Sequence, residues 1–374
     1  MKSLVYLANV RMPTEKAHGI QIMKTCESLA VRGLRVVLVV PERKNSHKET
    51  PFNFYNVEEN FSIIRSWCID FIGSPVCKKF FYNLETYTFY HSVKAFTKKE
   101  SFDIFFTRDL YLALKFSKFN KNVFFEIHSL PDKPTNKYKK TWKQVKGIVV
   151  ISQGIKDDLI KFGVDEKKIT IARDAVDIGK FSVKEEKLES RKRLGLPKDK
   201  NIALYAGHLY GWKGAHIFAQ AADKLPNTEF YVVGGTEGDL VKFKKKYNYK
   251  NLHYAGWQRH DKIPVWLNAV NVLVLPNCGS EKITTHYTSP MKMFEYMASG
   301  TPIVASDLPS IREVLSKRNA LLVKAGGVEG LAEGIEKILT DVPLSHKLAK
   351  QAKKDVTDFS WEGRLNETIK HIII

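Results

Sequence analysis

The chain has 374 residues, a length typical of two domains. Its composition, 44% hydrophobic and 27% charged, is that of a globular protein and excludes fibrous, collagenous and wholly disordered chains. The formal net charge of +20 favours a polyanionic partner: nucleic acid, an anionic membrane surface or a phosphorylated ligand.

Neither cysteine spacing nor hydropathy points to a secreted or membrane-spanning protein. The four cysteines show no CxxC or His-pair spacing, so reduced thiols are expected rather than a disulfide scaffold or a zinc site. No apolar run reaches the roughly 18 residues of a membrane span, and residues 1–7 are too short in their apolar part for a signal peptide. We therefore expect a cytoplasmic protein, with any membrane attachment confined to its surface.

Short apolar runs alternate with amphipathic helical stretches along the whole chain. Strands are expected at 4–8, 36–40, 104–107, 123–128 and 147–151, and in a second series at 202–206, 230–233, 272–275 and 303–305. Most lack polar alternation, which is typical of parallel strands covered on both faces. Two strand–helix series predict two doubly wound α/β domains. A polar stretch within 178–200 separates the series, so we assign residues 1–180 and 181–355 to the two domains.

Two turns that follow predicted strands carry features of a phosphate site. In the first, Gly19 opens a helix, where free amides and the helix dipole suit a phosphate. In the second, residues 203–214 form a buried strand and then a glycine-marked loop that carries His208 and Lys213. Cationic side chains at the carboxyl end of a parallel strand can bind a diphosphate.

A third candidate site lies in residues 289–306. Ser289 and Pro290 are expected to start a helix as its N-cap and first residue, and Gly300 is expected to end it. The N-terminal amides again offer an anion site. Glu295, about one turn into the helix, is placed to accept hydrogen bonds from sugar hydroxyls.

At these residues the chain resembles glycosyltransferase family 4, the retaining group 1 enzymes of GT-B architecture. Gly207 and Lys213-Gly214 are similar to the family's G-R-x-x-x-x-K-G, and residues 295–306 to its E-A-M-A-x-G-x-P-V-V-A-S. Three further segments match in order: 125–128 with E-x-H, 150–156 with V-I-S-x-x-x-K/R, and 175–181 with G-V-D-x-x-x-F. The resemblance implies two Rossmann-like domains facing a deep cleft, with residues 356–374 as a helix crossing back to the first domain.

The resemblance also implies roles for individual residues. Lys213 would hold the donor phosphates and stabilise the departing nucleotide diphosphate, Glu295 would bind the ribose, and His128 would lie beside the reacting sugar. The remaining donor contacts would come from Gly19, His208, Trp257, Gln258, Ser289, Pro290, Met291 and Lys292, with the last two acting through their amides. Trp257 and Gln258 belong to the loop that would flank the base.

Two positions depart from the family pattern. His208 replaces the family's arginine and is only partly charged near neutral pH. Tyr287 replaces the first glutamate of the family's E-x7-E motif, which usually contacts the donor sugar. These departures leave the sugar open and raise the alternative of a protein that binds a nucleotide sugar without transferring it.

Residues 78–99 are basic at both ends and dense in aromatic side chains. Such a segment suits an interfacial helix on an anionic membrane. A buried helix with lysine side chains that snorkel to the surface is the alternative.

The leading hypothesis is a retaining hexosyltransferase with a nucleotide diphosphate sugar as donor and a glycan or lipid-linked acceptor. No Asp-x-Asp stands on a predicted strand-end loop, so neither metal nor other cofactor is expected. A nucleic-acid-binding protein is a further alternative suggested by the charge. Because helix-turn-helix, RNP and zinc signatures are lacking, no nucleic-acid partner is expected. The expected location is the cytoplasm, with peripheral contact at the inner membrane face left open.

Overall fold

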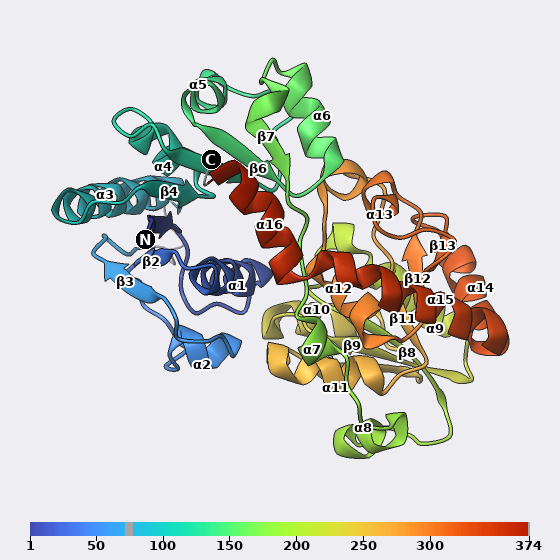
Figure 1. Ribbon diagram of the computed structural model, residues 1–374. Helices are drawn as coiled ribbons and strands as arrows, with labels where there is room; N and C mark the ends of the chain where they lie inside the picture. The colour runs from blue at the N-terminus through green and yellow to red at the C-terminus, as the bar shows by residue number, and fades with distance from the viewer. Residues whose placement is uncertain (72–77, 373–374) are drawn as a thin grey trace. The chain divides into compact units, whose positions relative to one another are not determined.

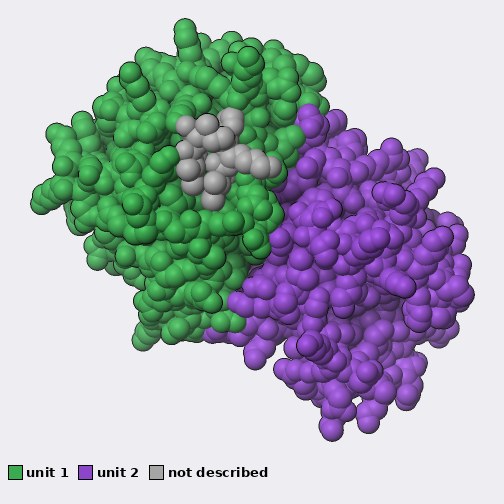
Figure 2. All heavy atoms as spheres, in the orientation of Figure 1, with its two compact units in different colours: residues 1–151, 155–172, 361–374 green, residues 152–154, 173–360 purple. Residues whose placement is uncertain are grey.

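The computed structural model describes residues 1–71 and 78–372 (Figure 1). The chain forms two compact units, coloured separately in Figure 2. The first, here called the N-unit, comprises residues 1–151, 155–172 and 361–374. The second, the C-unit, comprises residues 152–154 and 173–360.

The N-unit is built on a seven-stranded parallel sheet with strand order β3-β2-β1-β4-β5-β6-β7. Its strands are β1 (Ser3–Leu7), β2 (Arg35–Pro41), β3 (Ser62–Ser66), β4 (Ile104–Thr107), β5 (Val123–Ile127), β6 (Gly147–Val150) and β7 (Ile169–Ile171). The central strands are mostly apolar and are buried along their length, because helices cover both faces of the sheet (Figure 1).

The connecting helices of the N-unit come mainly from the first part of the chain. They are α1 (Ala17–Val31), α2 (Pro51–Tyr55), α3 (Lys78–Lys99), α4 (Leu110–Phe116), α5 (Asn136–Gln144), α6 (Gln153–Lys161) and the short η1 (Glu166–Lys168). The last helix of the chain, α16 (Trp361–Ile372), also belongs here and packs against α1, β6 and β7. The end of the chain thus stabilises the first unit.

The C-unit contains a six-stranded parallel sheet with strand order β10-β9-β8-β11-β12-β13. Its strands are β8 (Asn201–Ala206), β9 (Thr228–Val233), β10 (Leu252–Gly256), β11 (Val272–Leu275), β12 (Ile303–Ser306) and β13 (Leu321–Val323). Apolar clusters cover both faces of this sheet.

The helices of the C-unit lie before, between and after its strands. In chain order they are α7 (Ile178–Phe181), α8 (Lys187–Leu194), η2 (Gly211–Lys213), α9 (Ala215–Lys224), α10 (Glu237–Lys246), η3 (His260–Lys262), α11 (Ile263–Asn268), η4 (Ile283–Tyr287), α12 (Met291–Ser299), α13 (Pro309–Arg312), α14 (Val328–Thr340), α15 (Val342–Asp355) and η5 (Val356–Phe359).

The predicted pair of doubly wound parallel sheets is confirmed. Apart from residues 152–154, the chain leaves the N-unit after residue 172 and returns to it at residue 361. Residues 173–180, assigned to the first domain from the sequence, lie in the C-unit, because Val176 and the adjacent Phe181 are buried in its core. The amide of Val176 also donates to the carbonyl of Phe359 at 3.0 Å. The segment that enters the C-unit after residue 172 is thereby hydrogen-bonded to the segment that leaves it before residue 361.

Both sheets change direction at one point of the strand order, between β1 and β4 and between β8 and β11. Loops that follow neighbouring strands on either side of such a point diverge, and ligands of open α/β sheets bind there. The loops after β1 and β8 are those in which the sequence predicts phosphate contacts.

Candidate functional site

The loop after β8 is held in place by a close approach to the loop after β11. Gly214 has φ of +73°, and a Cβ at this position would lie 1.6 Å from the carbonyl oxygen of Pro276. Only glycine allows both the backbone conformation and this contact. The preceding residue, Lys213, is thereby placed at the carboxyl end of the sheet.

Lys213 carries an uncompensated positive charge. Its Nζ lies 5.5 Å from the ring centre of Tyr210 and 5.2 Å from that of Trp212, and it forms no ion pair with any described residue. Burial lowers the pKa of Lys213 to about 8. The ammonium is therefore mostly protonated at neutral pH, as a diphosphate ligand requires.

His208 stacks with the aromatic side chains that lie near Lys213. Its ring stacks on that of Tyr210, with centroids 5.2 Å apart and planes at 12°, and Tyr210 stacks in turn on Trp212. The carbonyl of His208 accepts a hydrogen bond from the Tyr205 hydroxyl at 2.7 Å. Its predicted contact with the donor stays a prediction.

Helix α12 begins one residue later than the sequence predicted. Pro290 occupies the N-cap position, so the prediction of Ser289 as N-cap and Pro290 as first helical residue is wrong. The Ser289 hydroxyl instead accepts a hydrogen bond from the amide of Asp174 at 3.1 Å. The first-turn amides of Met291 and Lys292 therefore have no side-chain cap, which suits an anion site.

Glu295 is held by a histidine that the sequence reasoning missed. Glu295 is 7% exposed, and its Oε1 lies 2.6 Å from Nε2 of His260 in η3. The His260 ring also packs against Phe181, with centroids 5.3 Å apart. Because one carboxylate oxygen is held by His260, the Glu295 side chain is oriented, as a contact to sugar hydroxyls requires.

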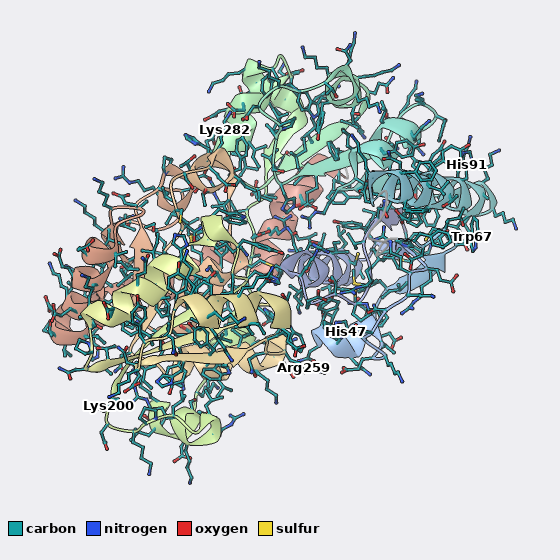
Figure 3. All side chains as sticks on the ribbon, turned by 180° about the vertical axis from the view of Figure 1, so that it is seen from behind. His47, Trp67, His91, Lys200, Arg259 and Lys282 are labelled. Atoms are coloured by element: carbon teal, nitrogen blue, oxygen red, sulfur yellow. The ribbon has the colours of Figure 1, made fainter. Side chains whose placement is uncertain are left out.

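The loop that is predicted to flank the base directly precedes His260, the partner of Glu295. Trp257 is 40% exposed, and the Gln258 side-chain amide donates to the carbonyl of Ala255 at 3.0 Å. Arg259, labelled in Figure 3, follows and forms an ion pair with Asp261 at 3.3 Å. The loop is thus joined to Glu295 through His260, while the contact of Trp257 and Gln258 with a base stays a prediction.

Tyr287, at the position of the family's glutamate, is a buried packing residue. It lies in η4 with 1% of its surface exposed, and the ammonium of Lys282, labelled in Figure 3, lies 5.4 Å from its ring centre. No carboxylate therefore stands at this position.

His128 of the N-unit belongs to a buried polar cluster at the end of β5. Its Nε2 lies 2.9 Å from Oε1 of Glu126, which lies 2.6 Å from the guanidinium of Arg364 on α16. Burial alone would raise the pKa of Glu126, but Arg364 and His128 hold it well below its usual value. Burial and the charge of Arg108 lower the pKa of His128 to about 4, so its imidazole is neutral at pH 7.

Gly19 is required by packing. A Cβ at Gly19 would lie 2.0 Å from the Tyr55 hydroxyl, which accepts a hydrogen bond from the amide of Thr14 at 2.7 Å. The amide of Gly19 donates to the carbonyl of Lys16 at 2.9 Å. The need for glycine is therefore explained without a ligand, and its phosphate contact stays a prediction.

A cavity of about 740 Å³ lies beside this turn in the N-unit. Most of the residues that line it are polar or charged; the full set is Asn9, Val10, Arg11, Thr14, Glu15, Lys16, His18, Arg43, Lys44, Asp70 and Phe71. Several of these charges are already compensated: Arg11 pairs with Glu15 at 2.6 Å, and Arg43 pairs with Glu85 at 2.6 Å.

Comparison with known families gives a match for each half of the chain. Residues 19–180 match the family described as Glycosyltransferase Family 4, and residues 186–355 match Glycosyl transferases group 1. Among curated relatives, an uncharacterized glycosyltransferase of Methanocaldococcus jannaschii is 22% identical over 59% of this chain and 58% of its own length. The lipopolysaccharide core biosynthesis glycosyltransferase LpsE of Rhizobium meliloti is 29% identical over 46% of this chain and 50% of its own. The matched region thus spans about half the length of these relatives.

Solved structures show the same fold over the whole chain. Sucrose-phosphate synthase from Thermosynechococcus elongatus superimposes with a TM-score of 0.80 at 18% identity and covers 99% of this chain and 98% of its own. Anabaena HepE in complex with UDP and glucose gives 0.77 at 14% identity, with 99% and 100% covered. These neighbours have the GT-B fold, which confirms the predicted fold class.

Proposed function

Given that the chain belongs to the group 1 glycosyltransferases of family 4, we propose that it moves a hexose from a nucleotide diphosphate sugar to a glycan or lipid-linked acceptor, with retention of configuration. The observation that carries the proposal is the uncompensated ammonium of Lys213 on the same unit as the uncapped first turn of α12. Both are sources of positive charge, and both follow strands at the switch point of the sheet.

The chemistry proposed for these groups is stabilisation of the leaving group. When the bond between the sugar and the diphosphate breaks, negative charge develops on the departing phosphate. Fixed cations and amides stabilise that charge more than the ground state and therefore lower the barrier. Because this positive charge comes from the protein itself, we propose that the reaction needs no metal, and activity should survive chelation by EDTA.

Glu295 and His128 would position the two parts of the donor. The Glu295 carboxylate, oriented by His260, would accept hydrogen bonds from ribose hydroxyls. The neutral imidazole of His128, oriented by Glu126, would exchange a hydrogen bond with a sugar hydroxyl. We assign His128 this positioning role and no proton transfer.

We test the proposal by incubating the protein with UDP-, GDP- and ADP-sugars and measuring the released nucleoside diphosphate. Slow release without acceptor from one donor is expected, since water can replace the acceptor hydroxyl. Proton NMR recorded before the released sugar mutarotates should show the anomeric configuration of the donor. Binding without any release would instead favour the non-transferring nucleotide-sugar binder, which the buried Tyr287 and the histidine at position 208 motivate.

We also propose a peripheral contact with anionic membranes through α3. Phe80 and Tyr87 on this helix are 62% and 52% exposed, and Lys79, Lys98 and Lys99 are exposed beside them. Exposed Trp67 after β3 and His91 on α3, both labelled in Figure 3, add to the surface. Among the residues that the structure describes, no helix is long and apolar enough to cross a bilayer.

A further inference from the structure

The side chain of Lys292 presents a buried ammonium without a hydrogen-bond partner. Lys292 lies in the first turn of α12, and its Nζ is buried and forms no hydrogen bond within residues 1–71 and 78–372. It lies 4.0 Å from the ring centre of Tyr205. An ammonium has three donors, and burying them without an acceptor is costly. Such a group is expected to serve a ligand.

The groups that surround this ammonium are already committed to other partners. Glu295, one turn along the same helix, is bound to His260 at 2.6 Å. The hydroxyl of Tyr205 on β8 donates to the carbonyl of His208. Lys213 on η2 is a like charge close enough to act on Lys292. Lys292 and Lys213 therefore act on each other as like charges, and the one carboxylate that acts on Lys292, Glu295, is already bound to His260.

The ammonium also lies at the loop in which the phosphate contacts are expected. A Cβ at Gly207 would lie 3.6 Å from Nζ of Lys292, so this glycine lies directly beside the ammonium. Gly207 immediately precedes His208, where the family pattern has an arginine. The Lys292 ammonium, on α12, thus lies next to position 208, where the family has its arginine.

We propose that the Lys292 side chain binds the diphosphate of the donor directly and, with Lys213, stabilises the leaving group in place of the family's arginine. This inference rests on the proposed function and assigns to the side chain a role that the sequence reasoning gave only to the backbone amide. Lys292 would be a catalytic residue, since it contacts the group that departs.

The proposal predicts that donor binding changes the protonation of Lys292. Burial, together with the charge of Lys213, lowers the pKa of Lys292 well below its usual value. A bound diphosphate would raise that pKa again. At pH 7.0 Lys213 is already mostly protonated, because its pKa is about 8. Any proton taken up when the donor binds should therefore go mainly to Lys292.

The test is calorimetric titration of wild type, Lys292→Met, Lys292→Arg and the control Lys350→Met, an exposed lysine of α15. UDP-glucose, GDP-mannose and ADP-glucose serve as probes, because their diphosphates do not titrate near pH 7. Each titration is run at pH 7.0 in two buffers of different ionisation enthalpy, which yields the number of protons taken up. Thermal melting without ligand is measured for each variant.

We expect Lys292→Met to bind the preferred probe about tenfold or more weakly, with less proton uptake than wild type. Lys292→Arg should retain affinity within a few fold, and Lys350→Met should behave as wild type. The melting temperature of ligand-free Lys292→Met should be equal to or higher than that of wild type, since an unpartnered buried ammonium is removed.

Two results would overturn the inference while leaving the proposed function intact. One is unchanged affinity and proton uptake in Lys292→Met. The other is a lower melting temperature or failure to fold in Lys292→Met, which would mark Lys292 as a structural residue. Failure of wild type to bind any of the three probes would overturn the proposed function itself.

Discussion

At the scale of single residues, the rate of turnover should depend strongly on the charge of Lys213. Lys213→Ala should lower the rate of nucleoside diphosphate release by about 100-fold or more, because removing one group that stabilises developing charge costs about 3 kcal/mol in the transition state. Lys224→Ala, in the exposed and long pair with Glu329, is the matched control. Equal rates for both variants, with unchanged melting temperatures, would remove Lys213 from the mechanism.

The pH profile of turnover should report the Lys213 ammonium. Burial lowers its pKa to about 8, and only the protonated form offers positive charge to the donor. We therefore expect kcat/KM for the donor to fall as the pH rises through about 8, since kcat/KM reports groups of the free enzyme. In Lys213→Arg this decline should disappear, because guanidinium stays charged. A decline that persists in Lys213→Arg would belong to another group.

How far the sequence predicts single residues depends on what surrounds them. Lys213 and Glu295 lie in local motifs, so the sequence alone predicts them as donor contacts. His260 is 35 residues from its partner Glu295, and no local pattern joins them. The buried ammonium of Lys292 likewise depends on the neighbouring Tyr205 and Gly207, which only the fold brings together.

At the scale of elements, the last helix is fastened to the N-unit by a buried ion pair. Arg364 of α16 pairs with Glu126 at 2.6 Å, and both side chains are nearly inaccessible. Arg364→Met should destabilise the N-unit by about 3–5 kcal/mol, because the Glu126 charge loses its main partner. Arg32→Met, which breaks the exposed pair between Arg32 and Glu362 of the same helix, should cost less than about 1 kcal/mol.

Urea unfolding followed by fluorescence measures both changes. The double variant with Glu126→Gln should recover part of the stability lost in Arg364→Met, since the unpaired carboxylate is then gone. Equal losses for Arg364→Met and Arg32→Met would show that the buried pair does not fasten α16.

Interior strands could be predicted from the sequence and edge strands could not. All nine expected strands are present, and the four that the sequence reasoning missed, β3, β7, β10 and β13, are the edges of the two sheets. Strands covered on both faces read as continuous apolar runs. Edge strands such as β3, with the sequence SIIRS and half-exposed side chains, lack that signal. The start of α12 was displaced because the Ser289 hydroxyl bonds to Asp174, which is remote in sequence.

The proposed membrane surface is a property of α3 and can be separated from overall charge. The triple variant of Lys79, Lys98 and Lys99 to Glu should lose co-sedimentation with anionic vesicles, since each basic residue contributes about 1 kcal/mol at such a surface. The same change at the exposed lysines 137, 139 and 140 of α5 is the control. Equal loss in both variants would leave only a general electrostatic attraction.

At the scale of the whole molecule, the two parallel sheets position residues for different parts of the proposed reaction. The C-unit holds the ammonium groups of Lys213 and Lys292 and the oriented carboxylate of Glu295. The N-unit holds the neutral His128 and a cavity lined mostly by polar or charged residues. The order of the matching motifs along the chain predicted this division. The points at which the chain crosses between the units depend on packing, because Val176 and Phe181 join the second core although they precede the polar stretch.

The most direct test of the account is whether the protein distinguishes a nucleoside diphosphate from its monophosphate. Thermal melting is compared with UDP, GDP and ADP and with UMP, GMP and AMP. A ligand that binds only the native state at 100 times its Kd stabilises it by about 2.7 kcal/mol, which at about 2–4 °C per kcal/mol is a shift of roughly 5–11 °C for a domain of this size. We predict such a shift for one diphosphate and a much smaller one for its monophosphate. Equal shifts for the pair, or no shift with any diphosphate, would contradict a site built to hold the diphosphate.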